Sequence, residues 1–183
     1  MSRKKPTANI SMFVENTHIL QEMLWEGKIY FALLEGHFNR QEFAHKSISN
    51  EEFIAVCSPK NILAKKANLL ENLLDQQLIL REPGSGTRDI LEQALYNRNL
   101  HFDDFTGKTQ ITNMNVIKAL CHRNIGITFM YRKAVKKELA TGYLVEIPLV
   151  DFNIQHPFNF VYLKDPSDKQ QIESLFETIM RLR

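Results

Sequence analysis

The sequence predicts an α/β protein with mainly parallel sheets, folded as two interleaved lobes. Apolar runs typical of strands alternate with amphipathic segments typical of helices along almost all of the 183 residues. The chain has no internal repeat and no flexible, low-complexity linker that would separate independent units. Two clusters of strands and helices joined by short extended segments therefore predict two lobes with a cleft between them.

The composition is that of an ordinary soluble globular protein, with 44% hydrophobic and 24% charged residues. A chain of this size can bury roughly 70% of its unfolded surface, so it needs no disulfide or metal to hold a core. The formal net charge of +2 gives no electrostatic indication of nucleic-acid or membrane-surface binding. No secretory signal and no run of 18 apolar residues is found, so we expect neither secretion nor a membrane span.

The two cysteines, Cys57 and Cys121, lie in the apolar contexts FIAVC and IKALC. Neither belongs to a CxxC motif or to a Cys and His spacing typical of metal ligands. We therefore expect two buried free thiols, which suit the reducing cytoplasm.

The first part of the chain predicts a βαβ unit. Residues 9–14 (NISMFV) have a strand pattern, and a helix is expected to follow, capped by Asn16 or Thr17. Gly27 can adopt the left-handed conformation that ends such a helix. Residues 28–36 (KIYFALLEG) form a near-continuous apolar run, which is typical of a strand buried on both faces.

The middle of the chain predicts strands and short helices in turn. Residues 42–57 are expected to form two extended segments that end in a turn at 58–61. A short helical piece at 67–75 leads to an apolar strand at 76–82. The next helix has an apolar stripe formed by Ile90, Leu91, Ala94 and Leu95.

Residues 109–149 repeat the order of strand, helix, strand, helix and strand. Asn124 is expected to be left-handed between a helix and a strand, and Gly142 is expected to end the following helix. The apolar face of the first of these helices consists of Ile117, Leu120 and Cys121.

The end of the chain predicts a late strand at 157–163 and a C-terminal helix. Asp165 is expected to cap this helix, with Pro166 at its first position and Asp168 reaching back to the cap. The predicted buried stripe of the helix consists of Ile172, Leu175, Phe176 and Ile179.

A sharp Gly-Ser-Gly-Thr corner, residues 84–87, joins the strand at 76–82 to the helix that follows. The first N–H groups of a helix have no intrahelical partner, and this end carries about half a unit of positive charge. Ser85 and Thr87 add hydroxyl donors, so the corner is a candidate anion site. The alternative is that Thr87 only caps the helix and the glycines only form a turn. The corner matches neither the P-loop nor the dinucleotide motif, which argues against a nucleotide site.

Four segments occur together in an order typical of one protein family. They are ENTHILQEMLWEGKIYFALLEG, LILREPGSGTR, VIKALCHRNIGITFM and AVKKELATGYLVEIPL. From about Asn9 to its C-terminus, the chain thereby resembles the effector-binding domain of LysR-type transcriptional regulators. The apolar strand that leads into GSGTR is the most recognisable part of the resemblance.

The resemblance implies a two-lobed fold of the type II periplasmic-binding-protein kind, with a small ligand in the interlobe cleft. It implies that lobe one comprises residues 1–55 plus 159–183 and that lobe two comprises residues 56–158. Arg88 has an alternative role, since an Arg in the first turn of a helix can brace a neighbouring loop. The effector-binding residues that the resemblance implies are Thr17, Ser85, Gly86, Thr87, Arg88 and Asn113.

The resemblance also implies a sensor of a small anionic effector, such as a carboxylate, that forms a homodimer or higher oligomer. The N-terminal helix-turn-helix of the family is missing, so DNA would be bound only through that absent part. The first strand of lobe one is missing as well, which makes this lobe incomplete and would expose unpaired backbone groups. We therefore expect dimerisation, rearrangement or strand exchange around residues 9–14.

Two other functions stay open at this point. Prephenate dehydratases resemble the same fold and place a Thr-Arg-Phe motif at the cleft, but here Asp89 stands in place of Phe. A solute-binding receptor would require a secretory signal. The six histidines form no metal motif, and no acid–base pair or nucleophile elbow is found. We expect no metal, no cofactor and no catalytic residue.

Overall fold

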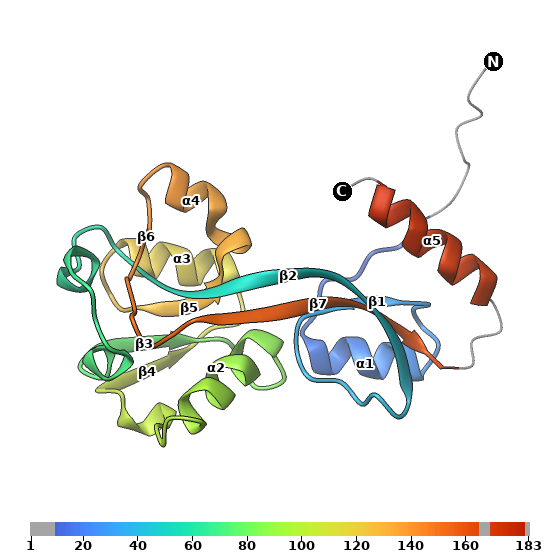
Figure 1. The fold of residues 1–183 in the computed structure, drawn as a ribbon, viewed down its shortest axis with the longest axis horizontal. Helices are drawn as coiled ribbons and strands as arrows, with labels where there is room; N and C mark the ends of the chain where they lie inside the picture. Colours follow the sequence, from blue (N-terminus) through green and yellow to red (C-terminus); the bar gives the residue numbers. More distant parts are fainter. Residues whose placement is uncertain (1–9, 165–168, 182–183) are drawn as a thin grey trace, which may run out of the picture.

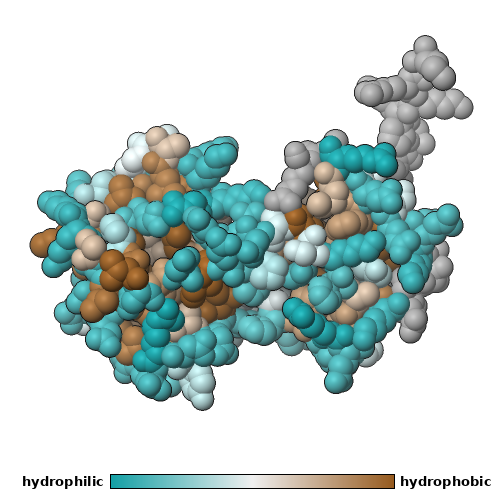
Figure 2. Space-filling model, in the orientation of Figure 1, coloured by the Kyte–Doolittle hydropathy of each residue, from teal (hydrophilic) through white to brown (hydrophobic). Residues whose placement is uncertain are grey.

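Two long antiparallel strands run through both halves of the molecule in the computed structural model (Figure 1). The structure describes residues 10–164 and 169–181. The strands β2 (Phe43–Cys57) and β7 (Ile154–Leu163) pair from Phe43 opposite Leu163 to Phe53 opposite Ile154. A bulge between Ser47 and Ser49 shifts their register. The shared strands join the two halves through a narrower waist (Figure 2).

One half contains helix α1 (Thr17–Trp25), strand β1 (Ala32–Leu34) and helix α5 (Lys169–Arg181) around one end of these strands (Figure 1). Strand β1 pairs antiparallel with β7. The Asn16 side chain caps α1 by accepting a hydrogen bond from the Ile19 N–H at 3.0 Å. Gly27 follows the helix in the left-handed region with φ +66°. The core of this half includes Leu24, Leu34, Phe43, Phe160, Val161 and Ile172.

The other half contains β3 (Gln77–Leu80) and β4 (Gly107–Gln110), which pair in parallel. A parallel bridge between Leu78 and Ile127 links β3 to β5 (Thr128–Tyr131). Both β5 and β6 (Val145–Glu146) pair antiparallel with β2. The helices are α2 (Gly86–Tyr96), α3 (Met114–His122) and α4 (Lys136–Ala140), with 3₁₀ turns at Ile62–Lys65, Leu70–Leu73, Phe102–Asp104 and Arg132–Val135.

The predicted turn at 58–61 is present, and Asn124 is left-handed with φ +60°, as expected. Gly142, with φ +69°, follows α4. The prediction of mainly parallel sheets is wrong, because every ladder of the larger sheet is antiparallel among the described strands. Alternating apolar and amphipathic segments indicate burial, but they contain no information on strand direction.

The predicted strand at 9–14 is also wrong, since the described residues 10–14 form no strand. Their apolar side chains point into solvent, and Ile10 is 87% exposed. A strand needs a neighbour for its backbone N–H and C=O groups, and no described strand pairs with this segment.

Of the strand predicted at 28–36, only the three residues of β1 are a strand, and this strand is not buried on both faces. Leu33 is 48% exposed, and β1 lies at the edge of the sheet, with β7 as its neighbour. The predicted βαβ unit is therefore wrong. The two segments expected within 42–57 are one strand, because the bulge at Ser47 bends it without ending it.

Only one member of the predicted stripe on the C-terminal helix is fully buried. Ile172 is buried, whereas Phe176 and Ile179 are half-buried. Leu175 is 43% exposed. The predicted cap at Asp165, Pro166 and Asp168 lies outside the described residues. None of the helices in the described ranges has the length and apolar character needed to cross a membrane.

Candidate functional site

The start of α2 presents a buried hydroxyl without a partner. Gly84 turns the chain after β3 with φ +84°, and Ser85 becomes the N-cap residue of α2. The Ser85 side chain is 1% exposed, makes no capping bond and has no hydrogen-bond partner among the described residues. Because buried polar groups are almost always satisfied, this hydroxyl is a candidate partner for a ligand or an ordered water.

A cavity of about 1650 Å³ opens next to Ser85 and is lined by residues from both halves. The starts of three helices contribute to its lining, with Thr17 of α1, Gly86 of α2 and Asn115 of α3. Helix N-termini attract anions through their free N–H groups and their dipoles. The cavity therefore contains three helix starts of the kind that can bind a small anion.

The three helix starts differ in how many donors they leave free. Asn16 caps α1, and Asn113 caps α3 by accepting from the N–H groups of Asn115 and Val116 at 2.9 and 3.2 Å. Ser85 does not cap α2. The N–H groups at the start of α2 consequently lack a cap from the side chain of their own N-cap residue.

A carboxylate from the other half lies against this terminus. The Thr87 hydroxyl donates to Oε1 of Glu35 at 2.7 Å, and the Thr87 backbone N–H also favours the charged form of this carboxylate. Burial nevertheless raises the pKa of Glu35 above its ordinary value, against the opposing effects of Thr87 and Arg81. Burial in the cleft therefore destabilises the charged form of Glu35.

The backbones of the two halves touch at this point. A Cβ atom added to Gly86 would lie 2.6 Å from the Gly36 nitrogen and 2.7 Å from the Gly36 Cα. Nearby, the His18 N–H of α1 donates to the Gly84 carbonyl at 3.2 Å. Only glycine allows so close an approach at residues 36 and 86, so these positions fix the contact between the halves.

Four of the six predicted site residues line the cavity, and the other two do not. Thr17, Ser85, Gly86 and Asn113 line the cavity, where they meet from three different helices. Thr87 is buried beside them, and its hydroxyl is directed to Glu35 rather than into the cavity.

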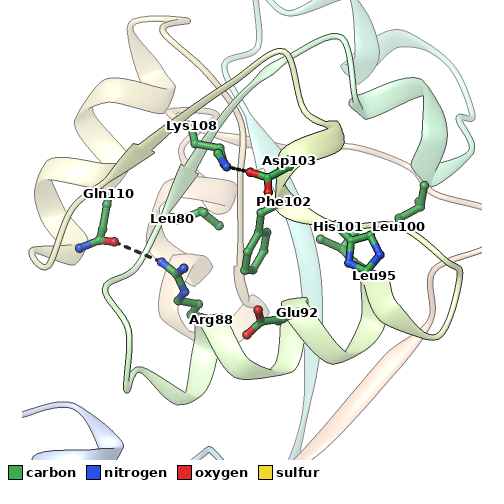
Figure 3. Close-up of a pocket in the computed structure, with 10 residues that line it drawn as sticks. All are labelled: Leu80, Arg88, Glu92, Leu95, Leu100, His101, Phe102, Asp103, Lys108 and Gln110. Carbon is green, nitrogen blue, oxygen red and sulfur yellow. Dashed lines mark hydrogen bonds and ion pairs between the residues drawn. The ribbon is translucent and has the colours of Figure 1, made fainter.

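Arg88 faces a second, smaller pocket of about 470 Å³ between α2 and β4 (Figure 3). Its Nη1 donates to the Arg81 carbonyl and to Oε1 of Gln110, both at 3.2 Å. The guanidinium also lies over the Phe102 ring, 5.1 Å from its centroid. This geometry is that of a residue bracing the loop before α2, the alternative role considered for Arg88.

Sequence reasoning missed the charged residues of the cavity, which are Glu15, Lys28, Glu35, Arg81 and Glu82. Arg81 holds Glu82 with two hydrogen bonds of 2.8 and 2.9 Å. Burial acts to raise the pKa of Glu82, but the hydrogen bonds from Arg81 keep it below its ordinary value. A carboxylate that ends an apolar run immediately before a glycine, as in LLEG, is the signal that could have identified Glu35. Among the described residues, no cluster of His, Cys, Asp or Glu side chains could hold a metal ion.

Comparison with known sequences identifies similar regulators. The family model described as "LysR substrate binding domain" matches residues 1–182. The chain is 26% identical over 142 residues to the uncharacterized HTH-type transcriptional regulator YeiE of Escherichia coli K12, covering 78% of this chain and 47% of YeiE. It is 22% identical over 158 residues to the HTH-type transcriptional regulator CysL of Bacillus subtilis 168, covering 86% and 52%. The chain thus spans about half the length of these curated relatives.

Solved structures share the two-lobed, periplasmic-binding-protein-like fold. The Synechocystis PCC6803 CcmR regulatory domain in complex with 2-PG superposes with a TM-score of 0.84 at 16% identity, covering 95% of this chain and 83% of that one. The effector-binding domain of QuiR in complex with shikimate gives a TM-score of 0.80 at 16% identity, covering 94% and 80%. The predicted two-lobed fold of the periplasmic-binding-protein kind is confirmed.

Proposed function

The chain belongs to the LysR substrate-binding domain family, and from this premise we propose that it senses a small anionic metabolite at the N-terminus of α2. The function is effector binding in a transcriptional regulator, as the family and the relatives imply, and not catalysis. The partnerless, buried Ser85 hydroxyl supports this position for the effector most directly. Two similar domains hold small molecules, 2-PG and shikimate.

We propose that the effector bridges the two lobes. Lobe one comprises residues 1–55 plus 159–183 and lobe two comprises 56–158, so that α1 and α2 contribute from opposite sides. The candidate ligands are Thr17, Ser85, Gly86 and Asn113, with Thr87 beside them and Arg88 bracing the loop before α2. An effector that prefers one lobe arrangement by about 1 to 3 kcal/mol is sufficient to shift the equilibrium. In the whole regulator this shift would be passed to a DNA-binding helix-turn-helix.

Combining Ser85→Ala with Thr87→Val in the full-length regulator tests the site. Hydrogen bonds to charged groups contribute about 1.5 to 3 kcal/mol each, so losing both hydroxyls should weaken effector binding roughly a hundredfold or more. Effector-dependent transcription should disappear while the circular dichroism spectrum stays close to wild type. The melting temperature should fall by only about 2 to 4 °C, because the hydrogen bond from Thr87 to Glu35 is lost.

A matched control is Ser174→Ala with Thr178→Val, which removes the same two hydroxyls from exposed positions of α5. The control should respond to effector like wild type. An unchanged response in the Ser85 and Thr87 double variant would remove the start of α2 from the mechanism.

We also propose that the chain forms a homodimer in the cytoplasm. Residues 10–14 and Leu33 expose apolar side chains beside the unpaired edge of β1, a combination that favours pairing with a second copy. The two cysteines are free and buried, as expected for a protein in a reducing compartment.

A further inference from the structure

The donors that we assign to the effector already hold a carboxylate of the chain itself. Glu35 comes from the loop after β1, in the opposite lobe, and accepts the Thr87 hydroxyl at 2.7 Å. The N–H of Thr87 also acts to lower the pKa of the same carboxylate and so favours its charged form. An effector oxygen at Thr87 and the Glu35 carboxylate would therefore need the same two donors.

No cation pairs with Glu35 among the described residues. Arg81 acts to lower the pKa of Glu35 through its charge alone, and its guanidinium is engaged by both oxygens of Glu82. A second anion entering the cavity would meet an unneutralised carboxylate, and like charges a few ångströms apart repel strongly at a partly buried site.

The Glu35 contact is also part of the junction between the lobes. Its neighbour Gly36 touches Gly86, and the Tyr131 hydroxyl of β5 donates to the Glu35 carbonyl at 3.3 Å. Displacing Glu35 from Thr87 would therefore break a polar link across this junction.

We propose that Glu35 is an internal ligand that competes with the anionic group of the effector for the N-terminus of α2. The effector binds by replacing Glu35 at Thr87, and this exchange couples binding to the rearrangement of the lobes. The inference rests on the anion site proposed above. It also identifies Glu35 as a residue that sets how strongly an anion must bind in order to switch the protein.

Inorganic sulfate is a suitable probe, measured by isothermal titration calorimetry at pH 7 against wild type, Glu35→Gln and Glu35→Ala. Glutamine keeps the size and the acceptor of Glu35 but removes the charge, and alanine removes both. Both variants should bind sulfate at least about tenfold more tightly than wild type, a change worth about 1.4 kcal/mol. Glu71→Gln removes the same charge from an exposed position far from Thr87 and should leave the affinity unchanged.

The possible outcomes separate the two proposals. Equal sulfate affinity in wild type and both Glu35 variants would overturn the competition and leave the anion site standing. Absence of sulfate binding in all of them would overturn both. An equal gain in Glu71→Gln would also overturn the competition, because it would reduce the effect to a change in overall charge.

Amide hydrogen exchange gives a second measurement. In wild type, saturating sulfate should increase exchange at Gly36 as Glu35 leaves Thr87, whereas Glu35→Gln should show a smaller change. Unchanged exchange at Gly36 in sulfate-bound wild type would contradict the displacement.

Discussion

Gly86→Ala is expected to separate the two halves at the start of α2 and to lower the free energy of unfolding by about 1 to 3 kcal/mol. The new methyl group would lie 2.6 to 2.7 Å from backbone atoms of Gly36, which no rotamer change can relieve. Alanine normally stabilises a helix by about 1 kcal/mol relative to glycine, so the expected sign is opposite to that of helix propensity. Urea unfolding measures the loss, and amide exchange at 36 and 86–88 should increase.

Gly27→Ala is the matched control, because no atom lies within 4 Å of the new methyl group. Its positive φ makes alanine unfavourable there, so some stability is lost through backbone strain alone. Amide exchange around α2 should nevertheless stay at the wild-type level. A Gly86→Ala protein as stable as wild type, with unchanged exchange at 86–88, would show that the contact with Gly36 is not a constraint.

Leu33→Lys is expected to weaken self-association of the chain roughly ten- to hundredfold. Leu33 is exposed on the edge strand β1, and burying a leucine at an interface contributes about 1.5 to 3 kcal/mol. Lysine on an edge strand also opposes strand pairing. Sedimentation velocity over a concentration series should show a dimer for wild type and mainly monomer for the variant.

Val150→Lys places the same charge on a side chain that is 70% exposed, in the half of the molecule opposite to β1. This variant should associate like wild type. A wild-type chain that remains monomeric at every concentration would contradict the proposed dimer, as would an unchanged dimer in Leu33→Lys.

Local signals in the sequence predicted those features that depend on neighbouring residues. Asn16, one of the two residues predicted as the cap, caps α1, and the strand at 76–82 leads through a glycine corner into α2. Left-handed Asn124 was predicted because its position between helix and strand demands a sharp turn. Such features follow from side-chain chemistry within a few residues, which the sequence displays directly.

Features that depend on distant partners could not be predicted in this way. Residues 10–14 have a strand pattern but form no strand, since strand formation requires a neighbour that no local pattern reveals. Glu35 lies 52 positions from Thr87, so neither their hydrogen bond nor the role of Glu35 in the cavity could be inferred from spacing. The antiparallel pairing of β2 with β7 likewise joins segments about a hundred residues apart.

The most direct test of the anion site is a titration of the ¹⁵N-labelled chain with sodium sulfate at constant ionic strength, followed by amide NMR. The amides of Gly86, Thr87 and Arg88 should shift progressively and saturate, because the first N–H groups of a helix point out of its N-terminus, where the anion is expected to bind. The Ser85→Ala, Thr87→Val protein should lose this response. Amides at 86–88 that stay unshifted while sulfate perturbs other parts of the chain would contradict an effector site at this helix.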